Sequence, residues 1–303
     1  MTSPMVLVAG SLHYDVVVTA DRLPGLDETL PGRSVSYLCG GKGGNQAIAA
    51  ALHGVPTAMA GRVGDDAFGR TLLDNLGRAG VDRSRVAVSM GMSSGMSVAI
   101  VTSEGDYGAV VVSAANLAID AADIQIPRGA RVVLLQNEIP ETANAVLAEK
   151  ARDTGAKVIL NAAPARPFET AFRSHIDLLI VNRFEATMLC GHAIESNADA
   201  IGAAGSLAAS GCDSIVTLGG GGVVLAFADG EPRHFPALRV QVHSTHGAGD
   251  VFAGALAARS ALGADLHAAL DYAQVAAALH VSCTPDERAS ITTEMVLEMV
   301  AKA

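Results

Sequence analysis

Short apolar runs alternate with alanine-rich segments along most of this 303-residue chain. The runs lie at residues 5–10, 131–136, 157–161, 177–181 and 214–219. Continuous apolar runs of this length are typical of strands that are covered on both faces, as in parallel sheets. Helix-forming sequence fills the intervals at residues 141–154, 168–174, 183–190 and 197–210. This alternation predicts a doubly wound α/β sheet whose ligands bind at the carboxyl ends of the strands.

Two stretches depart from the alternation. Residues 14–38 hold prolines and glycines between short strand-like pieces, and residues 96–113 hold two β-rich runs around residues 104–106, as in a hairpin. We expect both stretches to form a small antiparallel sheet, either as a lid over a site or as a decoration of the main sheet's edge. Towards the C-terminus, residues 247–281 and 292–302 are helix-forming.

The composition excludes several classes of function. Lys and Arg number 21 against 31 Asp and Glu, which gives a formal net charge of −10. We therefore expect neither nucleic acid nor an anionic membrane as a partner, because both require a basic face. Hydrophobic residues make up 50% of the chain, which argues against disorder. No apolar run reaches the ~18 residues of a membrane-spanning helix.

The N-terminus and the cysteines indicate a cytoplasmic protein. No Lys or Arg precedes Arg22, so the basic region of a signal peptide is missing. Without repeats or a low-complexity linker, the chain is expected to form one domain over residues 1–303. Four cysteines have no CxxC spacing and are predicted to be reduced thiols, namely Cys39, Cys190, Cys212 and Cys283.

The first candidate ligand site is the segment GGKGGNQA at residues 40–47, which abuts alanine-rich helical sequence. Glycines allow the backbone to take positive φ and to approach a ligand closely. Lys42, Asn45 and the first helical amides could together hold a polar ligand. The alternative is an ordinary turn between a strand and a helix. Neither a P-loop nor a GxGxxG fingerprint occurs in the chain, so those nucleotide-binding folds have no support.

The second candidate site is the segment GAGD at residues 247–250, which opens a predicted helix. The amides of Gly247, Ala248 and Gly249 can form an anion-binding nest, and the helix dipole adds to it. Asp250 could accept a proton from a hydroxyl that attacks a phosphoryl group held there. The alternative is that Asp250 only stabilises the first turn of the helix.

Two more segments at strand ends could serve a nucleotide and its metal. Four glycines at residues 219–222 could let a nucleotide lie against the backbone, or could simply form a glycine hairpin. Asn182 and Glu185 could orient a hydrated Mg²⁺, which prefers oxygen ligands and retains waters. The alternative for this pair is a helix cap with Glu at the third helical position.

Carboxylates also follow two of the predicted strands, at Asp15 and Glu138. Either could hydrogen-bond sugar hydroxyls, and the alternative for both is solvent exposure or capping. His13 lies beside Asp15 and is expected to be an ordinary hydrogen-bonded histidine. The histidines predict no metal site, because His243 and His246 lack a helical frame and a third ligand.

The order of these motifs resembles that of the ribokinase, or PfkB-type, carbohydrate kinase family. The resemblance covers residues 6 to about 291 and includes NAAPAR at residues 161–166. It implies a ribokinase-like three-layer fold with a mostly parallel sheet. It also implies a small antiparallel β lid over about residues 14–38 and 96–113, which often makes a homodimer contact as well.

The resemblance further implies transfer of the γ-phosphoryl group of ATP to a sugar hydroxymethyl group. Asp250 matches the family's catalytic base, and Gly247, Ala248 and Gly249 match its anion hole. The positions on the sugar side are His13, Asp15, Gly41, Lys42, Gly43, Asn45 and Glu138. The positions on the nucleotide side are Asn182, Thr217, Gly219, Gly220, Gly222, Gly249 and Gln274, with Glu185 holding Mg²⁺ through water.

Two departures from the family pattern affect the expected acceptor and cofactors. His13 replaces an Asn, and Tyr14 follows it, which predicts an aromatic rim and a changed acceptor. A nucleoside kinase and a non-catalytic sugar or nucleotide sensor are therefore alternatives to a sugar kinase. Ser244 replaces an Asp that binds an activating monovalent cation in the family. We expect little response to K⁺, with His246 placing a fixed charge there instead.

Overall fold

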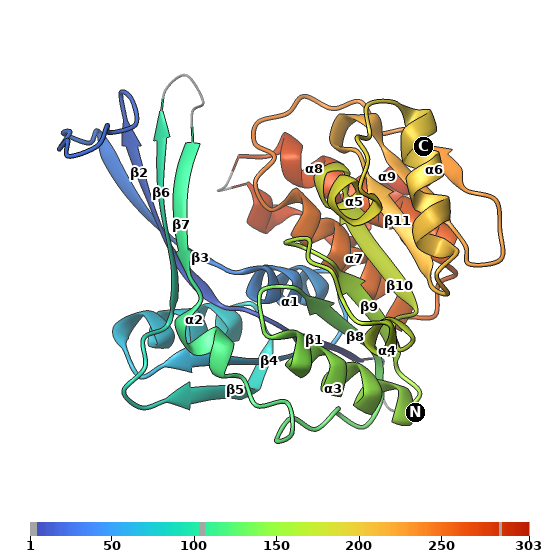
Figure 1. Ribbon diagram of the computed structural model, residues 1–303, viewed down its shortest axis with the longest axis horizontal. Coiled ribbons are helices and arrows are strands. Elements are labelled where there is room, and N and C mark those ends of the chain that lie inside the picture. The colour runs from blue at the N-terminus through green and yellow to red at the C-terminus, as the bar shows by residue number, and fades with distance from the viewer. Residues whose placement is uncertain (1–4, 103–106, 285–286, 303) are drawn as a thin grey trace.

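The computed structural model describes residues 5–102, 107–284 and 287–302. Within these ranges the main sheet has nine strands in the order β13-β12-β11-β10-β9-β8-β1-β4-β5 (Figure 1). Neighbours from β11 to β5 run parallel, and β12 and β13 add an antiparallel edge. The strands are β1 Met5–Ala9, β4 Thr57–Gly64, β5 Asp82–Ser89, β8 Ala130–Gln136, β9 Lys157–Asn161, β10 Leu178–Asn182, β11 Asp213–Thr217, β12 Val223–Ala226 and β13 Arg233–Phe235.

Helices cover both faces of this sheet. One face is covered by α1 (Lys42–Leu52), α2 (Ala67–Arg78), α7 (Ala248–Ala261), α8 (Leu266–Ser282) and α9 (Thr293–Val300). The other face is covered by α3 (Glu141–Asp153), α4 (Thr170–Arg173), α5 (Arg183–Cys190) and α6 (Asn197–Ala208). No helix in the described ranges is long and apolar enough to span a membrane.

Strand β1 explains why the apolar runs are continuous. Val6 and Val8 pack into the core under α1 and α7, whereas Leu7 and Ala9 pack into the core under α3. All four side chains are fully buried. A strand that is buried on both faces has no polar side to alternate with. The three-layer arrangement confirms the predicted fold class.

The hydrophobic pattern predicts β8 to β11 but does not predict β4 and β5. Strand β4 is buried by its neighbours, although its sequence mixes Ala, Gly and Arg62. Strand β5 lies at the sheet edge, where the charged side chains of Asp82 and Arg83 remain exposed. The helix predicted at residues 168–174 is reduced to the single turn α4.

The two irregular stretches form a second sheet of four strands within the described ranges. These strands are β2 His13–Ala20, β3 Ser34–Gly40, β6 Gly95–Thr102 and β7 Tyr107–Val112, in the order β3-β2-β6-β7. Each stretch is an antiparallel pair, and the two pairs join through a parallel β2–β6 contact. The turn predicted at residues 104–106 lies outside the described residues. This sheet is called the lid below. In Figure 1 one end of it projects freely beyond the helical layers, and the other end lies beside α2.

The lid joins the body where β1 ends and α1 begins. Only Gly10, Ser11 and Leu12 separate β1 from β2, and His13 pairs with Gly40 at the end of β3. Helix α1 then starts two residues later at Lys42. The polar side chains at the base of the lid therefore lie near the carboxyl edge of the main sheet.

We expect an alanine at Gly254 to destabilise the protein. Gly254 lies on α7 against α1, and a Cβ there would lie 2.6 Å from Ala49 Cβ and 2.7 Å from the Gln46 carbonyl oxygen. Overpacking of a core contact costs about 1–3 kcal/mol. Gly254→Ala should lower the free energy of unfolding by that amount in a urea titration.

Gly202→Ala is the matched control for this substitution. Gly202 lies on α6, and a Cβ at this position would meet nothing within 4 Å. Alanine in an open helical position is stabilising by about 0.5–1 kcal/mol relative to glycine. An unfolding free energy for Gly254→Ala at or above that of the unmodified protein would contradict the close packing of α1 against α7.

Candidate active site

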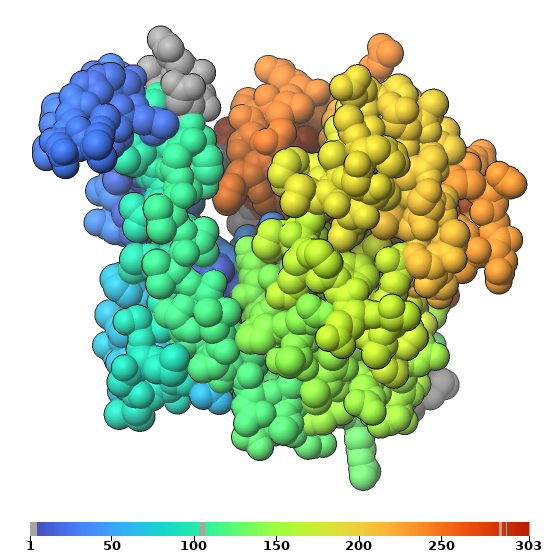
Figure 2. All heavy atoms as spheres, in the orientation of Figure 1, coloured from blue at the N-terminus to red at the C-terminus, as the bar shows by residue number. Residues whose placement is uncertain are grey.

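Two adjoining hollows lie at the carboxyl ends of the central strands. The larger, of about 580 Å³, lies between the glycines at residues 219–222 and helices α7 and α8. The smaller, of about 210 Å³, is lined by Lys42, Glu185 and Asp250 among others. Thr217, Gly249 and Phe252 line both hollows, so the two lie side by side. Figure 2 shows that the molecule is hollowed between the lid and the body.

Helix α7 begins between the two hollows. Its N-cap Gly247 has φ 78°, in the left-handed region that favours glycine. A left-handed residue followed by helical residues turns successive amides towards one side, which is the geometry of an anion-binding nest. The Ala248 amide donates a hydrogen bond of 3.2 Å to the Thr245 carbonyl oxygen, so a bound anion would have to share this amide with Thr245. Gly249 lines both hollows.

Asp250 lies in the first turn of α7, and α1 supplies hydrogen-bond donors to both of its oxygens. Asn45 Nδ2 lies 3.0 Å from Oδ2, and Gln46 Nε2 lies 2.9 Å from Oδ1. Burial raises the pKa of Asp250, whereas the positive charge of Lys42 and the two amides act in the opposite direction. A carboxylate in this setting can accept a proton from a group that enters the smaller hollow.

The glycines at the start of α1 permit a close approach to β1. Gly41 caps the helix with φ 87°. A Cβ on Gly43 would lie 2.7 Å from backbone atoms of Gly10 and Ser11, so only glycine fits there. This approach brings the Lys42 amide to 2.9 Å from Glu138 Oε2.

The carboxylates predicted to bind sugar lie around this helix start. Glu138 Oε2 also accepts a hydrogen bond from the Ser11 hydroxyl and lies 3.8 Å from His13 Nδ1. Asp15 Oδ1 accepts a hydrogen bond of 2.5 Å from the Ser97 hydroxyl of β6. The other ring nitrogen of His13, Nε2, is buried without a hydrogen-bond partner among the described residues. His13 is therefore only partly satisfied by the protein, in contrast to the ordinary histidine that was expected.

The predicted aromatic rim of Tyr14 is wrong. Successive residues of a strand point to opposite faces, so Tyr14 lies on the face opposite His13 and Asp15. Its ring packs against Phe68 of α2, with centroids 4.7 Å apart, and against Tyr37 of β3, with centroids 6.1 Å apart. Tyr14 thus packs the lid against α2 and does not narrow the part of the site that is predicted to bind sugar.

The residues predicted for the nucleotide side divide between the two hollows. Thr217, Gly219, Gly220, Gly222 and Gln274 all line the larger hollow. Gly222 has φ 90°, and a Cβ there would lie 2.1 Å from the Phe235 carbonyl oxygen. Glycine is therefore required at position 222, where β11 turns back into β12. Asn182 lies in the smaller hollow instead, beside Glu185.

Asn182 and Glu185 form the capping box that was the alternative for this pair. Asn182 Oδ1 accepts from the Glu185 amide, and Glu185 Oε2 accepts from the Asn182 amide, both at 2.8 Å. Burial raises the pKa of Glu185. A buried carboxylate at the edge of the smaller hollow has the oxygen chemistry that hydrated Mg²⁺ requires. A cap and a water-mediated metal contact are compatible, because the cap engages one carboxylate oxygen.

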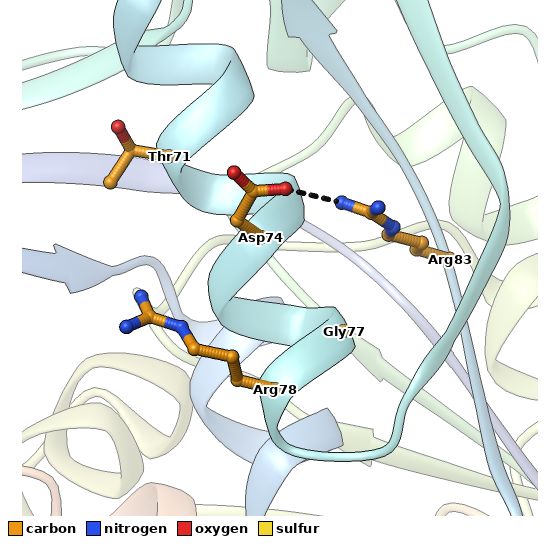
Figure 3. Close-up of a pocket in the computed structure, with 5 residues that line it drawn as sticks. All are labelled: Thr71, Asp74, Gly77, Arg78 and Arg83. Carbon is orange, nitrogen blue, oxygen red and sulfur yellow. Dashed lines mark hydrogen bonds and ion pairs between the residues drawn. The ribbon is translucent and has the colours of Figure 1, made fainter.

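A further hollow of about 700 Å³ lies on the outer surface at α2 (Figure 3). It is lined by Thr71, Asp74, Gly77, Arg78 and Arg83. Asp74 and Arg83 form an ion pair of 3.1 Å, and Arg78 extends from the other side of the helix. None of the residues predicted to bind a ligand lines this hollow, so the candidate site lies at the strand ends.

Several polar residues of the site are not predicted by the sequence patterns. Gln46 lies within the first glycine-rich segment, and Gln136 ends the strand that leads to Glu138. Their positions beside predicted site residues were a usable signal. Ser97 gave no such signal, because only the register between β2 and β6 brings it to Asp15.

Comparisons with known proteins agree with this architecture. The family model for pfkB family carbohydrate kinases matches residues 3–292. A ribokinase from Bacillus subtilis is 36% identical over 282 residues, which cover 91% of this chain and 92% of that protein. A deoxyribokinase from Salmonella typhi is 30% identical over 283 residues, which cover 91% of this chain and 92% of that protein.

The same relationship holds in three dimensions. The structure of Arabidopsis thaliana ribokinase complexed with ribose and ATP superposes with a TM-score of 0.91 at 31% identity, and the match covers 99% of both chains. The predicted family resemblance is thereby confirmed. With a family match over nearly its whole length and the fold of ribokinases, this chain belongs to the pfkB family of carbohydrate kinases and is a ribokinase-like phosphotransferase.

Proposed function

We propose that this protein transfers the γ-phosphoryl group of ATP to the hydroxymethyl group of a small sugar, with Asp250 as the base. The observation that carries the proposal is the position of Asp250. Its carboxylate lies in the smaller hollow beside Lys42, and Gly249 connects this hollow to the larger, nucleotide-sized one. The relatives that are ribokinases, one of them solved with ribose and ATP, support the same substrates.

In this reaction ATP occupies the larger hollow. Its base and ribose lie among Thr217, Gly219, Gly220, Gly222 and Gln274, and its phosphates reach the start of α7. The amides of Gly247, Ala248 and Gly249 stabilise the charge that develops on the transferred group. Glu185, with Asn182 beside it, would hold Mg²⁺ through water, and the ion would supply positive charge to the phosphates.

The sugar lies between α1 and the base of the lid. We assign its contacts to His13, Asp15, Gly41, Lys42, Gly43, Asn45 and Glu138. Asp250 takes the proton of the sugar hydroxyl while the hydroxyl oxygen forms a bond to the γ-phosphorus of ATP. The bond between that phosphorus and the oxygen that bridges it to the β-phosphate breaks, and ADP is released. The lid over residues 14–38 and 96–113 of this single domain excludes water during transfer.

A small sugar is favoured over a nucleoside as the acceptor. The nucleoside alternative relied on Tyr14 together with His13, and Tyr14 packs against Phe68 on the opposite face of β2. A non-catalytic sensor is disfavoured because a binding module has no need of a half-buried carboxylate at the start of α7.

We also infer a cytoplasmic location. The four cysteines are all unpaired thiols, which suits a reducing compartment where ATP is available. The net charge of −10 disfavours nucleic acid and anionic membranes as partners.

Asp250→Asn should remove most turnover while ATP still binds. The amide cannot accept the hydroxyl proton, and general-base catalysis contributes about 10²- to 10⁴-fold. Release of ADP should be measured with ribose, deoxyribose, fructose and nucleosides as acceptors, and ATP affinity by calorimetry. Turnover within a few-fold of the unmodified enzyme would contradict the role of Asp250. Tight binding of one acceptor by the unmodified protein, without turnover of any, would favour the sensor.

We propose that turnover needs no monovalent cation, because the chain supplies its own charge near Ser244. We expected His246 to supply this fixed positive charge, but Arg288 is better placed to supply it. The guanidinium of Arg288 donates from Nε to the His280 carbonyl and from Nη2 to the Ser244 carbonyl, each at 3.2 Å. His280 in turn donates from Nε2 to the His246 carbonyl at 2.9 Å, next to Gly247.

Replacing K⁺ with tetramethylammonium at fixed ionic strength should therefore change kcat by less than about twofold. The reason is that the guanidinium of Arg288, a cation carried by the chain itself, already contacts the Ser244 carbonyl oxygen in the loop before α7. The measurement is the steady-state rate over a titration of KCl. A steep rise of kcat with K⁺ would show that Arg288 does not replace the ion.

We propose that the protein forms a homodimer through the outer face of the lid. Cross-strand pairing aligns Val16, Tyr37, Val98 and Val110 in one row on the face opposite Asp15. Tyr37, Val98 and Val110 are 60%, 44% and 67% exposed. A row of exposed apolar residues across a whole sheet is suited to pairing with the same row of a second copy.

Val110→Asp should convert the dimer to a monomer in analytical ultracentrifugation. A carboxylate at the β7 end of the apolar row would be buried without a partner in the dimer. Val111→Asp is the matched control, because Val111 is 56% exposed and lies on the opposite face of the same strand. Equal effects of the two substitutions, or a monomeric unmodified protein, would contradict the proposed interface.

A further inference from the structure

We propose that Gln46 is a positioning residue for the base Asp250. Gln46 holds Oδ1 of Asp250, so that Oδ2 is the oxygen that accepts the substrate proton. This inference rests on the proposed function, in which Asp250 is the base. Gln46 lies on α1 and is fully buried. Its Nε2 lies 2.9 Å from Asp250 Oδ1 and 2.9 Å from Asn161 Oδ1.

The orientation of the Gln46 amide follows from its neighbours. Asn161, at the end of β9, donates from Nδ2 to the Ile180 carbonyl at 3.3 Å. A carbonyl oxygen can only accept, so the Asn161 side-chain oxygen must face Gln46. The atom of Gln46 that faces both Asn161 and Asp250 is therefore the donor Nε2.

Gln136 fixes the other end of the same amide. It is fully buried at the end of β8 and donates from Nε2 to Gln46 Oε1 at 2.7 Å. Gln136 lies across Gly10, where a Cβ would lie 1.8 Å from Gln136 Oε1 and 2.9 Å from Gly43 Cα, so a larger residue there would displace the Gln136 amide. The hydrogen bonds thus all point in one direction: Gln136 donates to Gln46, and Gln46 donates to Asp250.

The two oxygens of Asp250 are consequently not equivalent. Oδ1 is held by an amide that no solvent reaches. Oδ2 is held by Asn45, which is only partly buried and which we assign to the sugar. A sugar hydroxyl can share or displace the Asn45 contact, but it cannot reach Gln46. The proton therefore arrives at Oδ2 while Oδ1 stays anchored.

Gln46 also acts on the charge of the base. A donor to a carboxylate stabilises its ionised form, so loss of the donor raises the pKa of Asp250. The charged groups that face Asp250 are Lys42 of α1, Glu138 after β8 and Glu185 of α5. All three remain when Gln46 is replaced, so a change in the pH profile reports the missing amide.

The test is Gln46→Met, which keeps the length of the side chain and removes both polar atoms. We expect kcat to fall by about 10- to 100-fold, because a base that is displaced by about 1 Å loses that much rate. KM for sugar and for ATP should stay within about threefold, since neither substrate touches Gln46. The acidic limb of the kcat profile should move to higher pH.

Two further variants separate positioning from stability. Gln136→Met keeps Gln46 but removes the hydrogen bond that Gln136 donates to Gln46 Oε1. We expect kcat to fall, but by less than in Gln46→Met. This variant also serves if Gln46→Met does not fold. Asn144→Leu is the control, because Asn144 is buried and donates to the backbone carbonyl of Gln136 at 2.8 Å, outside the series of donors. It should lower Tm without moving the pH limb.

The outcomes distinguish this inference from the proposed function. If the unmodified protein phosphorylates no sugar, or Asp250→Asn is as active as the unmodified protein, the proposed function fails. If Asp250→Asn is inactive but Gln46→Met keeps the kcat and the pH limb of the unmodified enzyme, only the role of Gln46 fails. Its role also fails if Asn144→Leu loses kcat and shifts the limb as much as Gln46→Met does.

Discussion

The close contact between α1 and α7 is the constraint on which the site depends. Both helices begin at the carboxyl edge of the sheet, α1 with Lys42 and α7 at the residue after Gly247. Gly254 lets the two backbones approach until a Cβ would overlap Ala49. At that separation Asn45 and Gln46 reach Asp250. The spacing of two helices therefore sets the geometry of one carboxylate.

The charges of the site explain how an acidic chain can serve a polyanionic ligand. Glu138, Glu185 and Asp250 converge around Lys42, so the protein supplies little net positive charge there. In the proposed reaction the phosphates are held by backbone amides at the start of α7 and by Mg²⁺. Partial charges fixed in the backbone act over a few ångströms and do not depend on net charge. The value of −10 describes the surface and its partners, and it carries no information about this pocket.

The lid illustrates how strand register divides two roles between alternate residues. Asp15 and Ser97 lie on the face that meets the site, and Val16 and Val98 lie on the other face. A shift of the pairing by one residue would exchange these faces completely. The same alternation turns Tyr14 away from the sugar side, where it stabilises the lid through Phe68. One short strand thus carries, on one face, polar residues that we assign to the substrate and, on the other face, apolar residues that pack.

The sequence by itself determined the layered fold and the segments at strand ends and helix starts that form the candidate site. Apolar runs such as residues 131–136 are continuous because they are buried on both faces, and this property is local. Glycine-rich helix starts are equally local, because positive φ and close approach demand glycine at Gly41 and Gly247. Strands β4 and β5 are not predicted by the hydrophobic pattern. Strand β4 is buried by its neighbours and β5 lies exposed at the sheet edge, so neither has a continuous apolar run.

Only the tertiary structure decided which side chains meet. The contacts of Gln46 with Asp250 and Asn161 join residues that are 204 and 115 positions apart, and no local pattern encodes such a pairing. The direction of Tyr14, the approach of Ser97 to Asp15 and the contact of Arg288 with Ser244 likewise follow from register and packing. Propensity and periodicity act over one or two turns of chain, whereas a site is assembled where distant segments are packed together.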